Sequence, residues 1–423
     1  MTYNFIIKGD ICYSKNKDEL ITGKDKYLVC EDGYSRGVYD KIPESYKDFK
    51  LYDYSGKLIL PGLIDLHVHA PQYTFRGMGM DLELLDWLNT YTFPEESKYK
   101  DLSYASRAYE RFVEDLKYSS TTRACVFASL HVDSTILLMN LLEKSGLISY
   151  VGKVNMDRNA IEDLEEDDAK ESLSATRAWL DSIKDTYKRT FPIITPRFTP
   201  SCSDELMEGL GGMVEEYCLP VQSHLSENPG EIEWVKELCP WAKCYGDSYD
   251  RYKLFGSLTK TIMAHCVWSD EREQRLLKDR GVFIAHCPNS NLNLASGIAP
   301  IRKYLDQGQN IGLGSDIAAG SHLSIFRQVS DAIQVSKMYW RYIDQRCKPL
   351  SIEEGFYLAT LGGGKFFGKV GSLDKGYEFD ALVIDDADYK NENLSIEERL
   401  ERTIYMSEPR HVRHKWVSGK EIF

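Results

Sequence analysis

The sequence of 423 residues lacks the patterns of a membrane or secreted protein. It contains no run of about 18 apolar residues, so we predict no transmembrane helix and no membrane partner. The apolar run at residues 5–7 is too short for the apolar region of a secretory signal and is soon followed by charges. None of the ten cysteines forms a C-x-x-C pair, so we expect most of them to be reduced core thiols. These absences predict a cytoplasmic protein.

The sequence is also poor in positive charge. Its 52 lysines and arginines are outnumbered by 65 aspartates and glutamates, which leaves a formal net charge of −13. A negative protein repels phosphate groups, and this argues against nucleic acid as its main partner. Hydrophobic residues make up 43% and charged residues 28%, as in ordinary globular proteins, so we expect an ordered chain.

The middle of the sequence contains a regular alternation of helix-like and strand-like segments. Short apolar runs that end in polar residues, such as LIDLHVHA, LPVQSHLSE, TIMAHC and IGLGSD, alternate with amphipathic stretches such as YASRAYERFVEDLKYS. Eight such candidate strands predict a closed (β/α)8 TIM-like barrel over residues 61–368. Residues 1–60 and 369–423 have the alternating pattern of strands, and we expect them to pair into one small β-sandwich domain.

Five polar residues at the ends of the apolar runs are candidate metal ligands. They are His67, His69, His224, His265 and Asp316. His67 and His69 are two residues apart, so on a strand both imidazoles point to the same side. The carboxyl ends of barrel strands converge, so all five side chains would meet around one point. Imidazole with carboxylate suits zinc, with iron or another first-row metal as the alternative.

A single histidine at a strand end is more often a satisfied polar residue than a ligand. Here five of the nine histidines, counting His286, stand at the ends of apolar runs, and this coincidence favours a metal site. We expect the remaining four histidines to be structural or to lie at the surface.

Several motifs together resemble the amidohydrolase superfamily. They are PGLIDLHVHAPQY, ITPRFTPSCS, QSHLSEN, AHCPNSNLNLASG and GLGSD, and they extend over nearly the whole chain. HAPQY followed by LLDWLNTYTFPEE, and the TPRF tetrapeptide, are similar to the guanine deaminase family in particular. The resemblance implies a (β/α)8 barrel with a flanking β domain, homodimers, and one zinc ion per chain. The implied reaction is hydrolysis of guanine to xanthine and ammonia in purine catabolism or salvage.

The resemblance also implies roles for individual residues. His67, His69 and His224 would be firm zinc ligands. Asp316 would bind zinc and accept a proton, whereas His265 would contact the reacting water more than the metal. Glu227 follows His224 by three residues, just past the strand end, and would shuttle protons to the ring and to the leaving amine. The alternative for Glu227 is a loop carboxylate that caps the following segment.

Gln72, Arg197 and Phe198 are the candidate substrate contacts, together with His69 and Glu227. An amide offers a donor and an acceptor to a purine edge, a guanidinium can donate to a carbonyl oxygen, and a phenyl ring can stack on the base. The resemblance implies that guanine is recognised at these positions. From residue type alone, Arg197 could equally be an ion-pair partner at the surface as a substrate contact, and Phe198 is more often a core residue than a substrate contact.

Residues near these motifs have structural interpretations that we favour. Trp87 and Tyr91 are expected to pack helices, with lining of the pocket as the alternative. The polar residues of HCPNSN, which are Asn289, Ser290 and Asn291, are expected to tie loops together.

Three other functions compete with this interpretation. A two-metal cyclic amidase needs a bridging ligand, often a carboxylated lysine, and Lys153 is an awkward candidate for which we favour a structural role. A deaminase of cytosine, adenosine or a triazine would not need the pair of Gln72 and Arg197. A barrel that has lost catalysis and only binds partners would be expected to lack at least one residue that the deamination chemistry requires, and none of these residues is missing. The H-x-E and P-C-x-x-C motifs of the deaminases that flip bases out of nucleic acid are absent.

Overall fold

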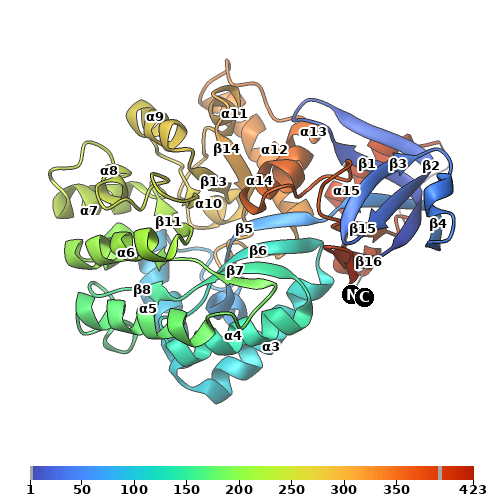
Figure 1. The fold of residues 1–423 in the computed structure, drawn as a ribbon. Coiled ribbons are helices and arrows are strands. Elements are labelled where there is room, and N and C mark those ends of the chain that lie inside the picture. Colours follow the sequence, from blue (N-terminus) through green and yellow to red (C-terminus); the bar gives the residue numbers. More distant parts are fainter. Residues whose placement is uncertain (1–2, 389–392) are drawn as a thin grey trace.

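The computed structural model describes residues 3–388 and 393–423, which form a barrel with a β-sheet against one side (Figure 1). The barrel wall consists of β5 (Leu63–His69), β6 (Thr121–Phe127), β7 (Ile148–Gly152) with β8 (Val154–Asn155), β9 (Thr190–Pro192) with β10 (Thr195–Pro196), β11 (Val221–Leu225), β12 (Thr261–His265), β13 (Phe283–His286) and β14 (Asn310–Leu313). Neighbouring strands pair in parallel. β7 and β8 count as one strand position, as do β9 and β10, so the described residues form eight positions, as predicted.

The barrel closes between its first and last strands. The backbone N–H of Asp316, just after β14, donates to the carbonyl of His67 on β5 at 2.8 Å. The N–H of His69 in turn donates to the carbonyl of Ile317 at 3.2 Å. The predicted closed barrel is therefore confirmed, and its closing hydrogen bonds involve three of the candidate ligands.

Helices cover the outside of the barrel because each has one apolar face. The longer ones are α3 (Leu102–Tyr118), α4 (Val132–Ser145), α5 (Ala169–Ile183), α6 (Asp204–Tyr217), α7 (Pro229–Leu238), α9 (Glu271–Arg280) and α12 (Ile325–Tyr342). Shorter ones are α1 (Leu84–Trp87), α2 (Phe93–Glu96), α8 (Asp247–Asp250), α10 (Pro288–Asn293), α11 (Ile301–Asp306), α13 (Ile352–Tyr357) and α14 (Gly363–Phe367). In α3, for example, Ala105, Phe112 and Leu116 are buried on one helix face, and Asp101 caps the first turn.

The two ends of the described chain form one seven-stranded sheet, in the order β17-β16-β15-β4-β1-β2-β3. Its strands are β1 (Phe5–Ser14), β2 (Leu20–Glu31), β3 (Tyr34–Tyr39), β4 (Lys50–Pro61), β15 (Ala381–Ile384), β16 (Val412–Val417) and β17 (Lys420–Glu421). Figure 1 shows the blue and red ribbons of these ends side by side. The predicted pairing of the two ends is confirmed, whereas the domain boundaries at residues 60/61 and 368/369 stay a prediction.

Apolar side chains lie on both faces of this sheet, because neighbouring residues of a strand point to opposite faces and both are apolar at several positions. Ile59 and Val383 belong to a cluster made mainly of sheet residues, whereas Leu58 and Leu382 belong to the larger cluster that includes the barrel core and α15 (Ile396–Met406). A buried ion pair adds a polar connection, because Arg123 on β6 donates to Asp380 at 2.7 Å and 3.0 Å. The sheet is thereby held against the amino-terminal half of the barrel.

All ten cysteines lie in the described part of the chain and carry free thiols, and eight of them are buried, in line with the predicted core positions. Among the described residues, no helix combines the length and the apolar character that crossing a bilayer requires.

Candidate active site

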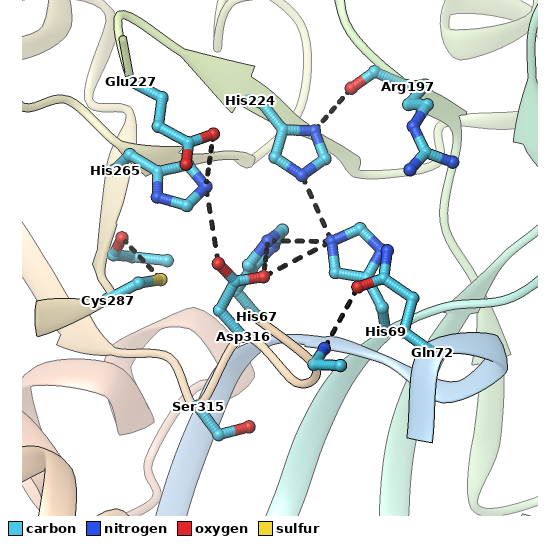
Figure 2. A network of polar contacts seen from close by, with 12 residues as sticks. His67, His69, Gln72, Arg197, His224, Glu227, His265, Cys287, Ser315 and Asp316 are labelled. Atoms are coloured by element: carbon cyan, nitrogen blue, oxygen red, sulfur yellow. Dashed lines mark hydrogen bonds and ion pairs between the residues drawn. The ribbon is translucent and has the colours of Figure 1, made fainter. Parts of the chain in front are cut away.

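The strand ends bring the predicted ligands to the carboxyl edge of the barrel. His67 and His69 stand on β5, and the side chains of His224 on β11 and His265 on β12 reach the same point (Figure 2). The backbone at His265 and Asp316 has positive φ values of 73° and 48°, which residues with a side chain rarely adopt. Such backbone conformations are common where the surrounding fold holds a functional side chain in place.

Three imidazole nitrogens and one carboxylate face one another at short range. The Nε2 atom of His69 lies 3.2 Å from the Nε2 atoms of both His67 and His224. Asp316 Oδ1 lies 3.1 Å from His67 Nε2. Two nitrogens bound at about 2.0–2.1 Å to a tetrahedral ion such as zinc are about 3.3 Å apart, so these spacings fit ligands of one ion. These atoms belong to two overlapping groups of three residues that could hold a metal ion, and the two groups share His67. One group is completed by His69 and His224, and the other by His265 and Asp316.

The protonation states of these groups suit metal binding. Burial and the neighbouring imidazoles hold the pKa values of His69 and His224 well below the usual range, which favours neutral rings. Burial opposes ionisation of Asp316, but the neighbouring His67, His265 and His69 together outweigh it and hold the pKa of this carboxyl well below its usual value. Neutral imidazole and ionised carboxylate are the forms that bind cations.

Hydrogen bonds to the far ring nitrogens orient two of the histidines. His224 Nδ1 lies 2.6 Å from the backbone carbonyl of Arg197, which can only accept, so His224 Nε2 is left without a proton and free to bind a metal. His265 Nδ1 lies 2.9 Å from Asn291 Oδ1. The Nδ1 atoms of His67 and His69 are buried and have no hydrogen-bond partner among the described residues.

Glu227 lies beside the candidate metal group but outside it. Its Oε2 is 3.3 Å from His265 Nε2, and Ser296 donates to its Oε1 at 3.2 Å. Burial raises the pKa of Glu227 to about 7, so the carboxyl can exchange a proton near neutral pH. Helix α7 is capped by Asn228 in a capping box with Glu231, so the alternative role of Glu227 as the cap is wrong.

The cluster opens into a pocket with an empty volume of about 420 Å³. Gln72, Trp87, Arg197 and Phe198 line it together with the candidate catalytic groups. Arg197 is therefore not the surface residue that its type alone allowed. Trp87 lines the pocket and also packs in the core, where its ring centre lies 5.4 Å from that of Phe75, so both interpretations hold for it. Tyr91 does not line this pocket and stacks on Phe75 at 6.3 Å.

Comparison with known proteins agrees with this geometry. Residues 58–422 match the amidohydrolase family. The chain belongs to this family. The amidohydrolase is 38% identical to guanine deaminase of Dictyostelium discoideum over 94% of this chain and 88% of that protein. It is 34% identical to guanine deaminase of Escherichia coli K12, covering 90% and 86% of the two chains. Its structure matches that of C. acetobutylicum guanine deaminase with bound guanine at a TM-score of 0.97 and 48% identity, over 99% and 100% of the chains.

Glu96 is a buried acid near the pocket that the sequence motifs did not indicate. Glu96, on α2, contacts both Gln72 and Arg197. It belongs to the FPEE segment that carries part of the family resemblance, but its sequence neighbourhood contains no ligand or catalytic motif. Its link to Arg197 spans 101 residues, so only the folded chain reveals the contact.

Lys153 and the HCPNSN segment have supporting roles in the amidohydrolase. Lys153 is buried and pairs with Glu166 at 2.5 Å, outside the groups of residues that could hold a metal. This contact leaves it as a structural residue and argues against a carboxylated bridging lysine. Asn289 accepts a hydrogen bond from the backbone of Ser321 at 2.8 Å, so this segment does tie loops together as predicted.

Proposed function

We propose that this amidohydrolase is a guanine deaminase that hydrolyses guanine to xanthine and ammonia. The observation that carries the proposal is that Gln72 and Arg197 line one pocket with the metal-facing histidines. These residue types at these positions suit a purine that presents a carbonyl oxygen. The 48% identity to a guanine deaminase with guanine bound supports the same substrate.

His67, His69, His224 and Asp316 are the proposed ligands of one zinc ion per chain, with His265 as a weaker contact. When bound, zinc would lower the pKa of a water molecule to about 7 and so provide a nucleophile at neutral pH. Asp316 would accept the proton that this water loses, because its carboxylate is ionised and buried beside the cluster. His265 Nε2 lies 3.3 Å from Glu227 and 3.8 Å from Asp316, so it is placed to orient the water between the two acids.

Glu227 is the proposed proton shuttle. The oxygen of water adds to the ring carbon that carries the amino group, and Glu227 donates a proton to the adjacent ring nitrogen. Glu227, now ionised, takes the proton of the added hydroxyl and passes it to the amino group. The carbon–oxygen double bond forms as the carbon–nitrogen bond breaks, ammonia leaves, and the proton held by Asp316 returns Glu227 to its protonated form. A carboxyl whose pKa is about 7 can both give and take these protons near neutral pH.

The remaining pocket residues are proposed to hold the base. The guanidinium of Arg197 donates to the carbonyl oxygen of guanine, and the amide of Gln72 contacts the ring edge. Phe198 lies against the ring face, since it is buried and lines the pocket. His69 and Glu227 face the end of the base that reacts.

We also propose that the protein is a cytoplasmic homodimer. The dimer is what the family resemblance of the sequence motifs implies. Ten free thiols suit a reducing compartment. Sedimentation of the purified protein would measure its mass, and a monomer at micromolar concentration would contradict the dimer.

Turnover by the purified, zinc-replete protein tests the proposed function. Guanine, adenosine, cytosine and a hydroxylated triazine are supplied in parallel, and release of ammonia is measured with the change in ultraviolet absorbance. We expect guanine to be converted to xanthine with the highest kcat/KM. Turnover of another compound without turnover of guanine would refute the substrate assignment.

A further inference from the structure

Glu96 is a buried carboxylate that joins the two proposed recognition residues without lining the pocket itself. Its side chain accepts from Gln72 Nε2 at 2.8 Å. It also accepts two hydrogen bonds from Arg197, at 2.5 Å from Nη1 and 3.2 Å from Nη2. One acid thus holds an amide from the segment after β5 and a guanidinium from the residue after β10.

Glu96 fixes which end of the Gln72 amide points in each direction. The amide nitrogen faces the carboxylate of Glu96, and the amide oxygen accepts from the backbone N–H of Ala318 at 3.0 Å. A flipped amide would place oxygen against carboxylate and NH₂ against N–H, and both contacts would be repulsive. The side chain therefore presents one fixed pattern of donor and acceptor to the pocket, instead of two interchangeable ones.

Glu96 also sets the position of the Arg197 guanidinium. A paired contact to a carboxylate fixes the plane of a guanidinium as well as its place, because the two groups match in geometry. Phe93, on the same helix α2, lies under the guanidinium at 5.2 Å from its ring centre. A guanidinium has only donors, so the N–H groups left over can serve an acceptor such as a carbonyl oxygen but not an amino group.

We propose that Glu96 is a positioning residue that makes the pocket selective for purines with a carbonyl oxygen at the position facing Arg197. This inference rests on the proposed function, because it concerns the recognition of guanine. Without the carboxylate, only the backbone N–H of Ala318 still orients the Gln72 amide, and Arg197 loses the partner that orients it. The expected loss is therefore in the recognition of the carbonyl, while the proton transfers near Glu227 are left in place.

The adjacent Glu95 offers a matched control. It is also a buried acid on α2, and it pairs with Lys98 at 2.6 Å and contacts Thr74 and Tyr104. It does not line the pocket and has no contact to Gln72 or Arg197 among the interactions of the described residues. Glu95→Gln therefore reports the general cost of neutralising a buried acid on this helix.

The experiment compares Glu96→Gln and Glu95→Gln with the wild type on two substrates. These are guanine and 2-aminopurine, which carries the reacting amino group but lacks the carbonyl oxygen. We expect Glu96→Gln to lower kcat/KM for guanine about 30-fold or more, mostly through KM, since leaving a buried charge without its partner is costly. The value for 2-aminopurine should change by less than about threefold, and Glu95→Gln should leave the ratio between the two substrates unchanged. Zinc content and melting temperature are measured on each variant.

Three outcomes would overturn the inference. The first is an equal loss on both substrates with Glu96→Gln, which would indicate a merely structural role. The second is unchanged guanine kinetics, and the third is a loss of zinc that accounts for the defect. If Glu96→Gln gives no folded protein, Glu96→Asp is used instead, because it withdraws the charge by one methylene. The inference requires this variant to show the same loss of selectivity, and selectivity equal to that of the wild type would overturn it. A wild type that does not turn over guanine would refute the proposed function as well, whereas an active wild type with an unaffected variant would refute only the role of Glu96.

Discussion

Replacing Glu227 by glutamine tests the proposed proton transfers most directly. Glutamine has nearly the same size and can still accept from Ser296, which lies 3.2 Å from Glu227 Oε1. Glu227 is absent from the groups of described residues that could hold a metal, so the variant should keep its zinc. What the variant loses is a titratable carboxyl whose pKa, raised by burial to about 7, suits proton exchange at neutral pH.

The expected magnitude follows from this loss. General acid–base catalysis by one positioned group contributes about 10²- to 10⁴-fold to the rate. At about 1.4 kcal/mol for each factor of ten, this is about 3 to 6 kcal/mol of barrier height. We therefore expect kcat for guanine to fall by at least about 100-fold in Glu227→Gln, with a much smaller change in KM, because the substrate is held mainly by other residues.

The assay combines steady-state guanine turnover with metal analysis of the same preparation. Glu273→Gln is a suitable control, because Glu273 is a buried acid that accepts from Ser226 at 2.6 Å and lies outside the pocket. It should retain most of the activity of the wild type. Loss of zinc from Glu227→Gln would point to a ligand role, and a kcat within a few-fold of the wild type would refute the shuttle.

Further predictions concern the metal, the pH dependence and the contact between sheet and barrel. Chelation should abolish turnover and lower the melting temperature, and one zinc ion per chain should restore both; two tightly bound ions would contradict the single site. Burial and nearby lysines lower the pKa of His131 to about 4. Between pH 6.5 and 4 the unfolded chain therefore binds more protons than the folded chain, and the free energy of unfolding falls as the pH falls. His131→Gln should therefore flatten this acid limb in denaturant titrations, and an unchanged slope would contradict the shift. Asp380→Asn should lower the free energy of unfolding by about 3 kcal/mol, because it leaves Arg123 buried with a weakened partner, and stability equal to the wild type would be evidence against that pair.

The fold and the metal-facing group were predictable because they depend on short-range patterns. His67 and His69 share a face of β5 as a consequence of strand periodicity, and the strand-end rule brings His224 and Asp316 to the same place. The pairing of the two ends followed from their alternating patterns. The roles of the individual ligands stay predictions that the metal analysis and the Glu227 variant will test.

The contacts that the sequence did not reveal are those between side chains far apart in the chain. Glu96 meets Arg197 across 101 residues, and no local pattern distinguishes it from Glu95 beside it. Trp87 and Tyr91 are four residues apart on one helical stretch, yet only Trp87 faces the pocket. Which side of such a short segment faces the pocket depends on how the loop after β5 folds over the barrel, and periodicity alone does not determine this.

The pairing of strands in the seven-stranded sheet also has a consequence for the chain while it is being synthesised. β4 pairs with β15, and 320 residues separate the end of one at Pro61 from the start of the other at Ala381. At about 5–20 residues per second, synthesis of the intervening chain takes roughly 16 to 64 s. During that time the edge of β4 that later pairs with β15 has no partner and can attract other nascent chains. Truncation before β15 would leave this edge exposed permanently, so aggregation is the expected fate of such fragments.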